Sequence, residues 1–120
     1  MEVIYAYTRA QAIEDGVLID VSTVAREAGF RWPVAMTSTV WGRFVEVPPG
    51  VEAQDEQGRL WDILWMLHVA TKAGKGGSEI RFSLHVRNDN LSPKLVNLKA
   101  LCGPGDDFEP VITVMMPDED

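Results

Sequence analysis

Hydrophobic and polar residues alternate most regularly in the last third of the chain. Four apolar residues are each followed by a polar or charged one, which predicts a strand with one buried face: Ile80, Phe82, Leu84 and Val86. The pattern returns in Lys94–Cys102 and Pro110–Met116, each preceded by a turn-forming segment rich in Gly, Pro, Asn or Asp. Three successive strands with short polar connections indicate an antiparallel meander.

Glycine and proline divide the first half of the chain into short elements. Thr8 is suited to cap a helix over Arg9–Glu14, because its hydroxyl can accept a free backbone N–H at the helix start. Gly16 can end that helix, and the β-branched, mostly apolar segment Val17–Val21 predicts a short strand. Ser22 is then expected to cap a second short helix.

The segment that follows is ambiguous. Pro33 suits the first turn of a helix, because its missing N–H is not needed there, and we expect Val34–Phe44 to be helical. The Thr, Ser and Val residues within it lower its helix propensity, so a strand remains an alternative. Val47–Gly50 contains two prolines and a glycine and is expected to form a turn.

The strongest helical pattern covers Gln57–Ala73. One stripe at helical spacing consists of Leu60, Ile63, Leu64, Leu67 and Thr71. Trp65, Met66 and Val69 fall on the opposite side, where a surface helix normally carries charge. We expect a core helix that is covered on both sides. One alternative is an exposed apolar patch that binds a partner or a second copy of the chain, and another is an apolar ligand pocket beside Trp61 and Trp65.

These elements together predict an α+β fold. Short helices at the N-terminus and the central apolar helix would pack on a C-terminal antiparallel sheet of three or four strands. The length of 120 residues and the hydrophobic content of 46% fit a single globular domain over residues 1–120.

The charge balance, the hydrophobic pattern and the cysteine content exclude several classes of protein. Lys and Arg number 11 against 18 Asp and Glu, which gives a net charge of −7, so direct binding to nucleic acid is not expected. The apolar run Ile63–Thr71 is too short to cross a membrane, and the N-terminus does not resemble a signal peptide. A single cysteine excludes a disulfide within the chain. We therefore expect a soluble, cytoplasmic protein.

No group of residues forms a recognisable catalytic or metal-binding pattern. His68 lies on the apolar helix, where a hydrogen-bonded position in the core or at its edge is the simplest interpretation, and His85 lies on the polar face of its strand. Cys102 could act as a nucleophile with a histidine only if the fold joined them, and it is expected on a different strand face from His85. The glycine-rich segment 74–77 lacks the spacing of a phosphate loop. We expect no catalytic residue, metal ion or cofactor.

The end of the chain is strongly acidic. Residues 106–120 carry six acidic residues and no basic one. Asp106, Asp107 and Glu109 follow a Gly-Pro-Gly turn and lack the ligand spacing of a calcium loop. Solvated surface charge is the simplest interpretation, and contact with a basic surface on another protein is the functional one.

Five long segments, in order, carry a resemblance to a known family: YTRAQAIEDGVLIDV at 7–21, AREAGF at 25–30, GRLWDILWMLHVA at 58–70, VRNDN at 86–90 and LCGPGDDFEPVITVMMPDED at 101–120. Over nearly its whole length the chain resembles an uncharacterised family of small proteins from bacteria, plasmids and phages. The resemblance implies no established activity and carries over no catalytic residue. Its mobile-element setting implies a role in host interaction or defence evasion.

The leading functional prediction is a non-enzymatic protein-interaction domain, such as an accessory or inhibitory factor of mobile genetic elements. Its partner would be another protein of unknown identity, or a second copy in a homodimer. Two surfaces are candidates for binding, the far side of the central helix and the acidic segment, that is Trp65, Met66, Val69, Asp106, Asp107 and Glu109. The alternative is a small enzyme or small-molecule-binding protein with a pocket lined by Trp61, His68, Arg81 and His85.

Overall fold

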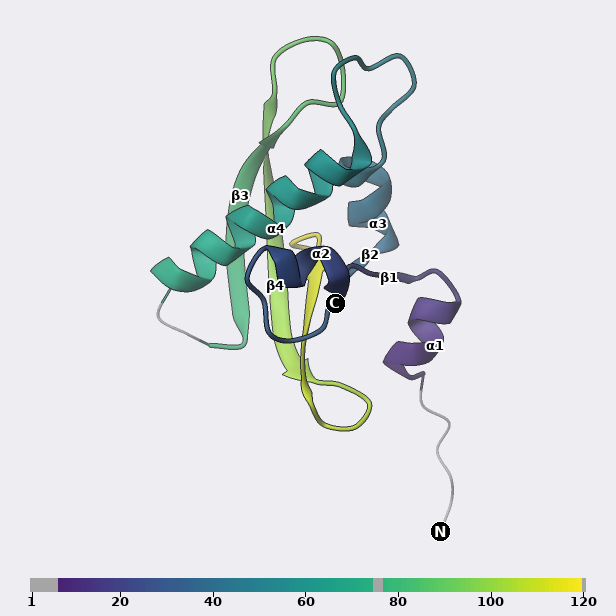
Figure 1. Ribbon diagram of the computed structural model, residues 1–120, viewed down its shortest axis with the longest axis vertical. Helices are drawn as coiled ribbons and strands as arrows, with labels where there is room; N and C mark the ends of the chain where they lie inside the picture. The colour runs from purple at the N-terminus through teal and green to yellow at the C-terminus, as the bar shows by residue number, and fades with distance from the viewer. Residues whose placement is uncertain (1–6, 75–76, 120) are drawn as a thin grey trace.

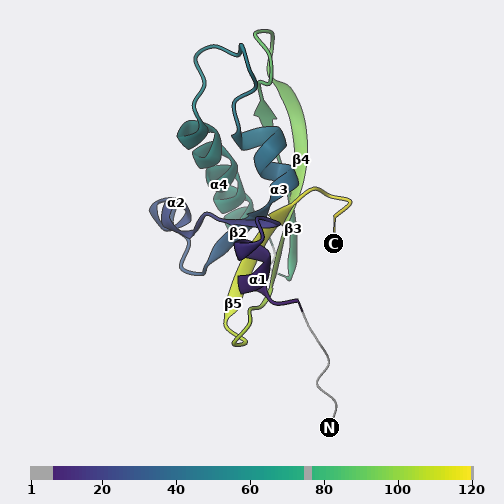
Figure 2. The same cartoon turned by 90° about the vertical axis from the view of Figure 1, so that its right-hand side faces the viewer.

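A five-stranded sheet in the order β1-β2-β5-β4-β3 organises the computed structural model, which describes residues 7–74 and 77–119. The strands are β1 (Leu18–Asp20), β2 (Val34–Thr37), β3 (Glu79–Val86), β4 (Lys94–Pro104) and β5 (Pro110–Met115). The helices are α1 (Arg9–Glu14), α2 (Ser22–Glu27), α3 (Ser38–Val40), the π-helix η1 (Trp41–Val45) and α4 (Glu56–Ala73). Helices α2 and α4 lie on one side of the sheet (Figure 2). The α+β class is confirmed.

Some predictions concern residues that lie outside the described part of the chain. The expected absence of a signal peptide involves the first six residues. The other residues are 75–76 in the glycine-rich segment and Asp120 in the acidic end. Among the residues that are described, no helix combines the length and the apolar character that a membrane span requires.

The C-terminal meander is confirmed. β3 pairs with β4 in antiparallel register, with Phe82 opposite Leu98, and β4 pairs with β5 in the same sense, with Ala100 opposite Val114. Along β3 the apolar residues point into the core and Arg81, like the other polar residues between them, is exposed. The period of two therefore identified both the strand and its buried face.

The sheet is larger than expected and is mixed. The prediction of a helix over Val34–Phe44 is wrong for its first part, because Val34–Thr37 forms β2, which pairs with β5 in parallel and with β1 in antiparallel sense. Val34, Ala35 and Met36 are all buried, so these residues have neighbours on both faces of the sheet. Burial on both faces produces a continuous apolar run, which periodicity alone does not separate from a helix.

The predicted N-cap residue is correct for the first short helix, α1, and wrong for the second, α2. Thr8 accepts the N–H of Gln11 and the Gln11 side chain accepts the N–H of Thr8, so a capping box starts α1 as predicted. Gly16 follows with a φ of +78°. Ser22 is instead the first residue of α2, and its hydroxyl donates to Asp20 and accepts the N–H of Val34, which ties α2 to β2.

Helix α4 makes more contact with the sheet than any other helix. Asp55 caps its start by accepting the N–H of Gly58 at 2.6 Å. Its buried apolar residues join one core cluster with residues of β2, β3, β4 and β5; they are Leu60, Ile63, Leu64 and Leu67. In Figure 1 the helix crosses β3, and its C-terminal end projects past this edge strand.

Substitution of Gly29 tests the contact between α2 and α4. Gly29 has a φ of +107°, and a Cβ added there would lie 2.9 Å from Cε1 of His68. Gly29→Ala is therefore expected to lower the free energy of unfolding by about 1–3 kcal/mol in urea denaturation. Gly42→Ala is the matched control, because nothing lies within 4 Å of an added Cβ at Gly42. Equal stability of the two variants would contradict the close packing of Gly29 on His68.

Candidate functional site

The outward side of α4 is apolar and open to solvent. Trp65, Met66 and Val69 expose 46%, 37% and 43% of their surface. The expectation of a core helix covered on both sides is therefore wrong for the single chain, and the alternative of an exposed patch describes the structure. The physical reason is that α2, with six residues, packs beside α4 and leaves its outward side uncovered (Figure 2). We call Trp65, Met66 and Val69 the α4 patch.

A row of aromatic rings borders the α4 patch. The rings of Trp61 and Trp65 stack with centroids 6.1 Å apart, and the rings of Trp65 and His68 stack at 5.6 Å. Phe30 meets His68 edge to face at 5.5 Å. The three residues of α4 are spaced by four and three positions, so they share one side of the helix. His68 is half-buried against Gly29, so of the two expected positions, in the core or at its edge, it takes the second.

A groove of about 380 Å³ separates the α4 patch from β3. Its lining combines one carboxylate and one imidazole with mainly apolar side chains: Asp62, Trp65, Met66, Ser83, Leu84, His85 and Leu95. Leu95 is 60% exposed and belongs to β4, opposite His85. The groove therefore joins the exposed side of the helix to the edge of the sheet.

A buried arginine lies at the N-terminal end of α4, where sequence reasoning did not look for one. Arg59 is only 5% exposed. Its guanidinium donates to the carbonyl of Val45 at 3.1 Å, to the carbonyl of Arg87 at 2.8 Å and to Oδ1 of Asn88 at 2.6 Å. One side chain thus holds together the end of η1, the start of α4 and the loop after β3. The length of the Arg side chain and its fan of donors suit this task.

The loop after β3 is held by a second set of polar contacts. Arg87 donates to the carbonyls of Glu52 and Asp89, and Asn90 donates to the carbonyl of Gly50 and accepts the N–H of Glu52. The turn-forming segment before Lys94, which contains RNDN at 87–90, was expected only to connect two strands. Its Asn and Arg side chains instead fasten the 50–54 segment, which leads into α4.

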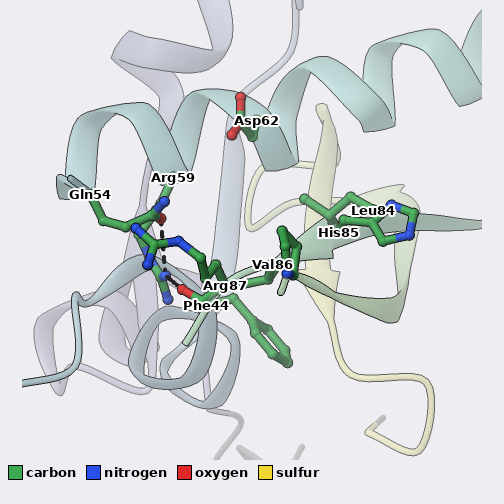
Figure 3. Close-up of a pocket in the computed structure, with 9 residues that line it drawn as sticks. Phe44, Gln54, Arg59, Asp62, Leu84, His85, Val86 and Arg87 are labelled. Atoms are coloured by element: carbon green, nitrogen blue, oxygen red, sulfur yellow. Dashed lines mark hydrogen bonds between the residues drawn. The ribbon is translucent and has the colours of Figure 1, made fainter. Parts of the chain in front are cut away.

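Arg59 and Arg87 border a cavity of about 210 Å³ that also contains Asp62 and His85 (Figure 3). Within the described part of the chain, neither arginine has a carboxylate at ion-pair distance. Burial lowers the pKa of the Arg59 guanidinium, and the positive charge of Arg87 lowers it further. Burial also raises the pKa of the Asp62 carboxyl. The cavity therefore combines two guanidinium groups with an incompletely solvated carboxylate.

The acidic turn has a structural role. Asp106 accepts the N–H of Arg9 at 2.8 Å and that of Ala10 at 3.0 Å, so it holds the start of α1. Glu109 accepts the N–H of Asp107. Phe108 is 86% exposed at the tip of this turn, a surface feature that sequence reasoning passed over. The contacts of Asp106 leave its predicted binding role untested, and they make its substitution a poor probe of an interface.

The four residues of the alternative pocket are divided between helix α4 and strand β3. Trp61 and His68 belong to the aromatic row on α4. Arg81 pairs with Glu79 on the exposed face of β3 and lines another cavity together with Pro117, while His85 lines the groove. Neither Trp61 nor His68 lines the cavities that contain Arg81 or His85.

The described structure does not bring the candidate nucleophile Cys102 together with His85. Cys102 is a half-buried free thiol on the inward face of β4, whereas His85 is exposed on the opposite face, as the alternation predicted. Over residues 7–74 and 77–119, no three His, Cys, Asp or Glu side chains gather to hold a metal ion.

The geometry defines a small α+β protein with an exposed apolar helix beside an open sheet edge. The chain belongs to DUF6573, a family of unknown function, whose model matches residues 1–120. This confirms the expected membership of an uncharacterised family. No curated protein and no solved structure matches the chain.

Substitution of Arg59 tests its role in joining three segments. Arg59→Met is expected to lower the free energy of unfolding by roughly 3 kcal/mol, because each buried acceptor left without a donor costs about 1–3 kcal/mol. Arg59→Lys should recover only part of the loss, since one ammonium group cannot reach all the acceptors. Arg43→Met is the control, because its side chain is exposed and only its carbonyl takes part. Equal free energies of unfolding in urea for Arg59→Met and Arg43→Met would contradict this role.

Substitution of Asp106 tests the capping contact on α1. The N–H groups of Ala10 and Arg9 hold the pKa of Asp106 below its ordinary value of 3.8. The ionised carboxylate therefore stabilises the fold above pH 3.8, and this contribution is lost as the pH falls through the lower folded-state pKa. Asp106→Asn should flatten the acid side of the profile of melting temperature against pH. Asp107→Asn is the control, and an identical change in both variants would refute the assignment.

Proposed function

We propose that the chain is a non-enzymatic protein-interaction domain whose anchor is the α4 patch. The observation that carries the proposal is the exposure of Trp65, Met66 and Val69 together on one side of a long helix. Large apolar side chains gathered on a surface are characteristic of binding sites, and Trp and Met are enriched there. An accessory or inhibitory factor would act by occupying the surface of its partner in this way.

The packing beneath the α4 patch supports the proposal. The stacked rings of Trp61, Trp65 and His68 limit the rotation of the Trp65 side chain before any partner arrives. The inward side of the same helix is fixed by Ile63 and Leu64, which are fully buried. A side chain that is already ordered loses less conformational entropy on binding, so more of its burial contributes to affinity.

A small-molecule site is the second candidate function, and the cavity beside Arg59 and Arg87 is where such a site would lie. Its volume of about 210 Å³ is below the range of roughly 300–1,000 Å³ that is typical of ligand pockets. The Arg59 guanidinium already donates to Val45, Arg87 and Asn88. These internal contacts make a structural role the stronger interpretation of the cavity, and the protein-interaction proposal takes precedence.

The double substitution Trp65→Ser with Met66→Ser tests the proposed function. Chemical cross-linking in cells that naturally express the chain, followed by mass spectrometry, identifies the partner. Purified partner should then bind the variant at least about 30-fold more weakly, since truncation of a central anchor costs about 2 kcal/mol or more. Leu91→Ser is the matched control, because Leu91 is 74% exposed and lies outside the α4 patch. Equal affinity of both variants would refute the role of the α4 patch.

A further inference from the structure

The outer edge of β3 carries backbone groups that no strand of the described chain uses. β3 ends the strand order, and only β4 pairs with it. The N–H of Cys102 donates to the carbonyl of Ser78, so even-numbered residues of β3 exchange hydrogen bonds with β4 in the antiparallel ladder. The N–H and C=O groups of Glu79, Arg81, Ser83 and His85 therefore point away from the sheet.

This edge has few of the features that protect exposed strands. β3 spans eight residues and contains no proline, and its inward residues Ile80, Phe82, Leu84 and Val86 are all apolar. The strand at the opposite edge, β1, has only three residues and packs against α1. Long edge strands without a proline or an inward charge readily accept another strand.

The groove beside α4 gives an added strand a place for its side chains. Helix α4 crosses β3 and projects past it (Figure 1). Trp65 and Met66 of this helix line the groove together with Ser83, Leu84 and His85 of β3. In an added strand, every second side chain would point toward this helix. Asp62 is the one carboxylate in the groove lining, and no described cation lies within ion-pair distance of it.

We propose that an extended segment of a partner protein binds along β3 as an added strand, with alternate apolar side chains against Trp65 and Met66 and a basic side chain near Asp62. The inference rests on the proposed function and specifies how the partner is held. Main-chain hydrogen bonds to Arg81, Ser83 and His85 would supply affinity, and the side-chain contacts would supply specificity. The free carboxylate of Asp62 and the net charge of −7 both favour a basic segment.

A second copy of the chain fits this edge less well. Two β3 strands paired in antiparallel sense are related by an axis normal to the sheet, so both α4 helices would lie on the same side. Each α4 already projects over the edge that the other copy would need (Figure 1). Two copies with a net charge of −7 each would also repel one another.

The test uses the variants Ser83→Pro and Ser83→Ala of the full chain. Both lose the bond from the Ser83 hydroxyl to Asn97, but only proline removes the outward N–H, and an edge strand tolerates proline at such a position. The probe is a displayed library of random peptides selected on the unmodified chain, and the best peptide is then synthesised. We expect it to alternate apolar residues, to contain Lys or Arg, and to bind Ser83→Pro at least about tenfold more weakly than Ser83→Ala.

Charge recognition has its own pair of variants. Asp62→Asn should weaken binding of the synthesised peptide about three- to tenfold, because a charge-assisted contact would be lost. Glu56→Gln is the matched control, since Glu56 is exposed in the first turn of the same helix and does not line the groove. Equal affinities of the two variants would overturn the proposed role of Asp62.

Amide hydrogen exchange of the unmodified chain gives a readout that does not depend on the folding of any variant. Saturation with the synthesised peptide should slow exchange of the Arg81, Ser83 and His85 amides, which point outward. Unchanged exchange at these amides would overturn strand addition. So would a peptide that binds Ser83→Pro as well as Ser83→Ala, or a selection that yields no peptide.

The proposed function fails separately from this inference. The synthesised peptide could bind Ser83→Pro with unchanged affinity and fail to bind the Trp65→Ser, Met66→Ser variant. This result would overturn strand addition and leave the α4 patch as the anchor. Sedimentation that shows a dimer of Ser83→Ala but not of Ser83→Pro would identify a second copy as the occupant and overturn the choice of a partner segment.

Discussion

The one-sided packing of α4 is the constraint on which the rest of the structure depends. The helix is apolar on nearly every side, yet the described residues form only one sheet, and this sheet covers only the stripe that contains Ile63, Leu64 and Leu67. Burial of that stripe forms the core with β2 to β5. The opposite side is left to solvent because the other helices are too short to form a second covering layer. The α4 patch follows directly from this imbalance.

Arg59 determines where α4 sits over the sheet. Its guanidinium holds η1 and the loop after β3 against the start of the helix, and Arg87 and Asn90 fasten the segment that precedes it. A buried cation without an ionic partner is costly, and the cost is offset here because neutral carbonyl and amide oxygens surround the group. The N-terminal end of α4 is thereby fixed, while its other end projects past β3.

The same placement connects the fold with the proposed mode of binding. An open strand edge by itself offers only main-chain hydrogen bonds, which all sequences share. Helix α4 adds Trp65, Met66 and Asp62 to the groove beside that edge, so a bound segment would meet both apolar side chains and a charge. The aromatic row limits the motion of the Trp65 side chain. Family membership alone does not suggest this arrangement, because the family has no assigned function.

The sequence by itself determined the elements whose signals are local. The alternation from Ile80 to Val86 gave β3 and its buried face, Thr8 with Gln11 started α1, and the period of Gln57–Ala73 located α4. Only the tertiary structure decided that Val34–Thr37 is a strand, because burial on both faces removes the alternation that would mark it. The tertiary structure also decided which side of α4 is covered. When apolar residues surround a helix, its hydrophobic pattern does not indicate which side is exposed. Arg59 and the groove depend on residues far apart in the sequence, and no local spacing brings Val45, Arg87 and Asn88 around one guanidinium.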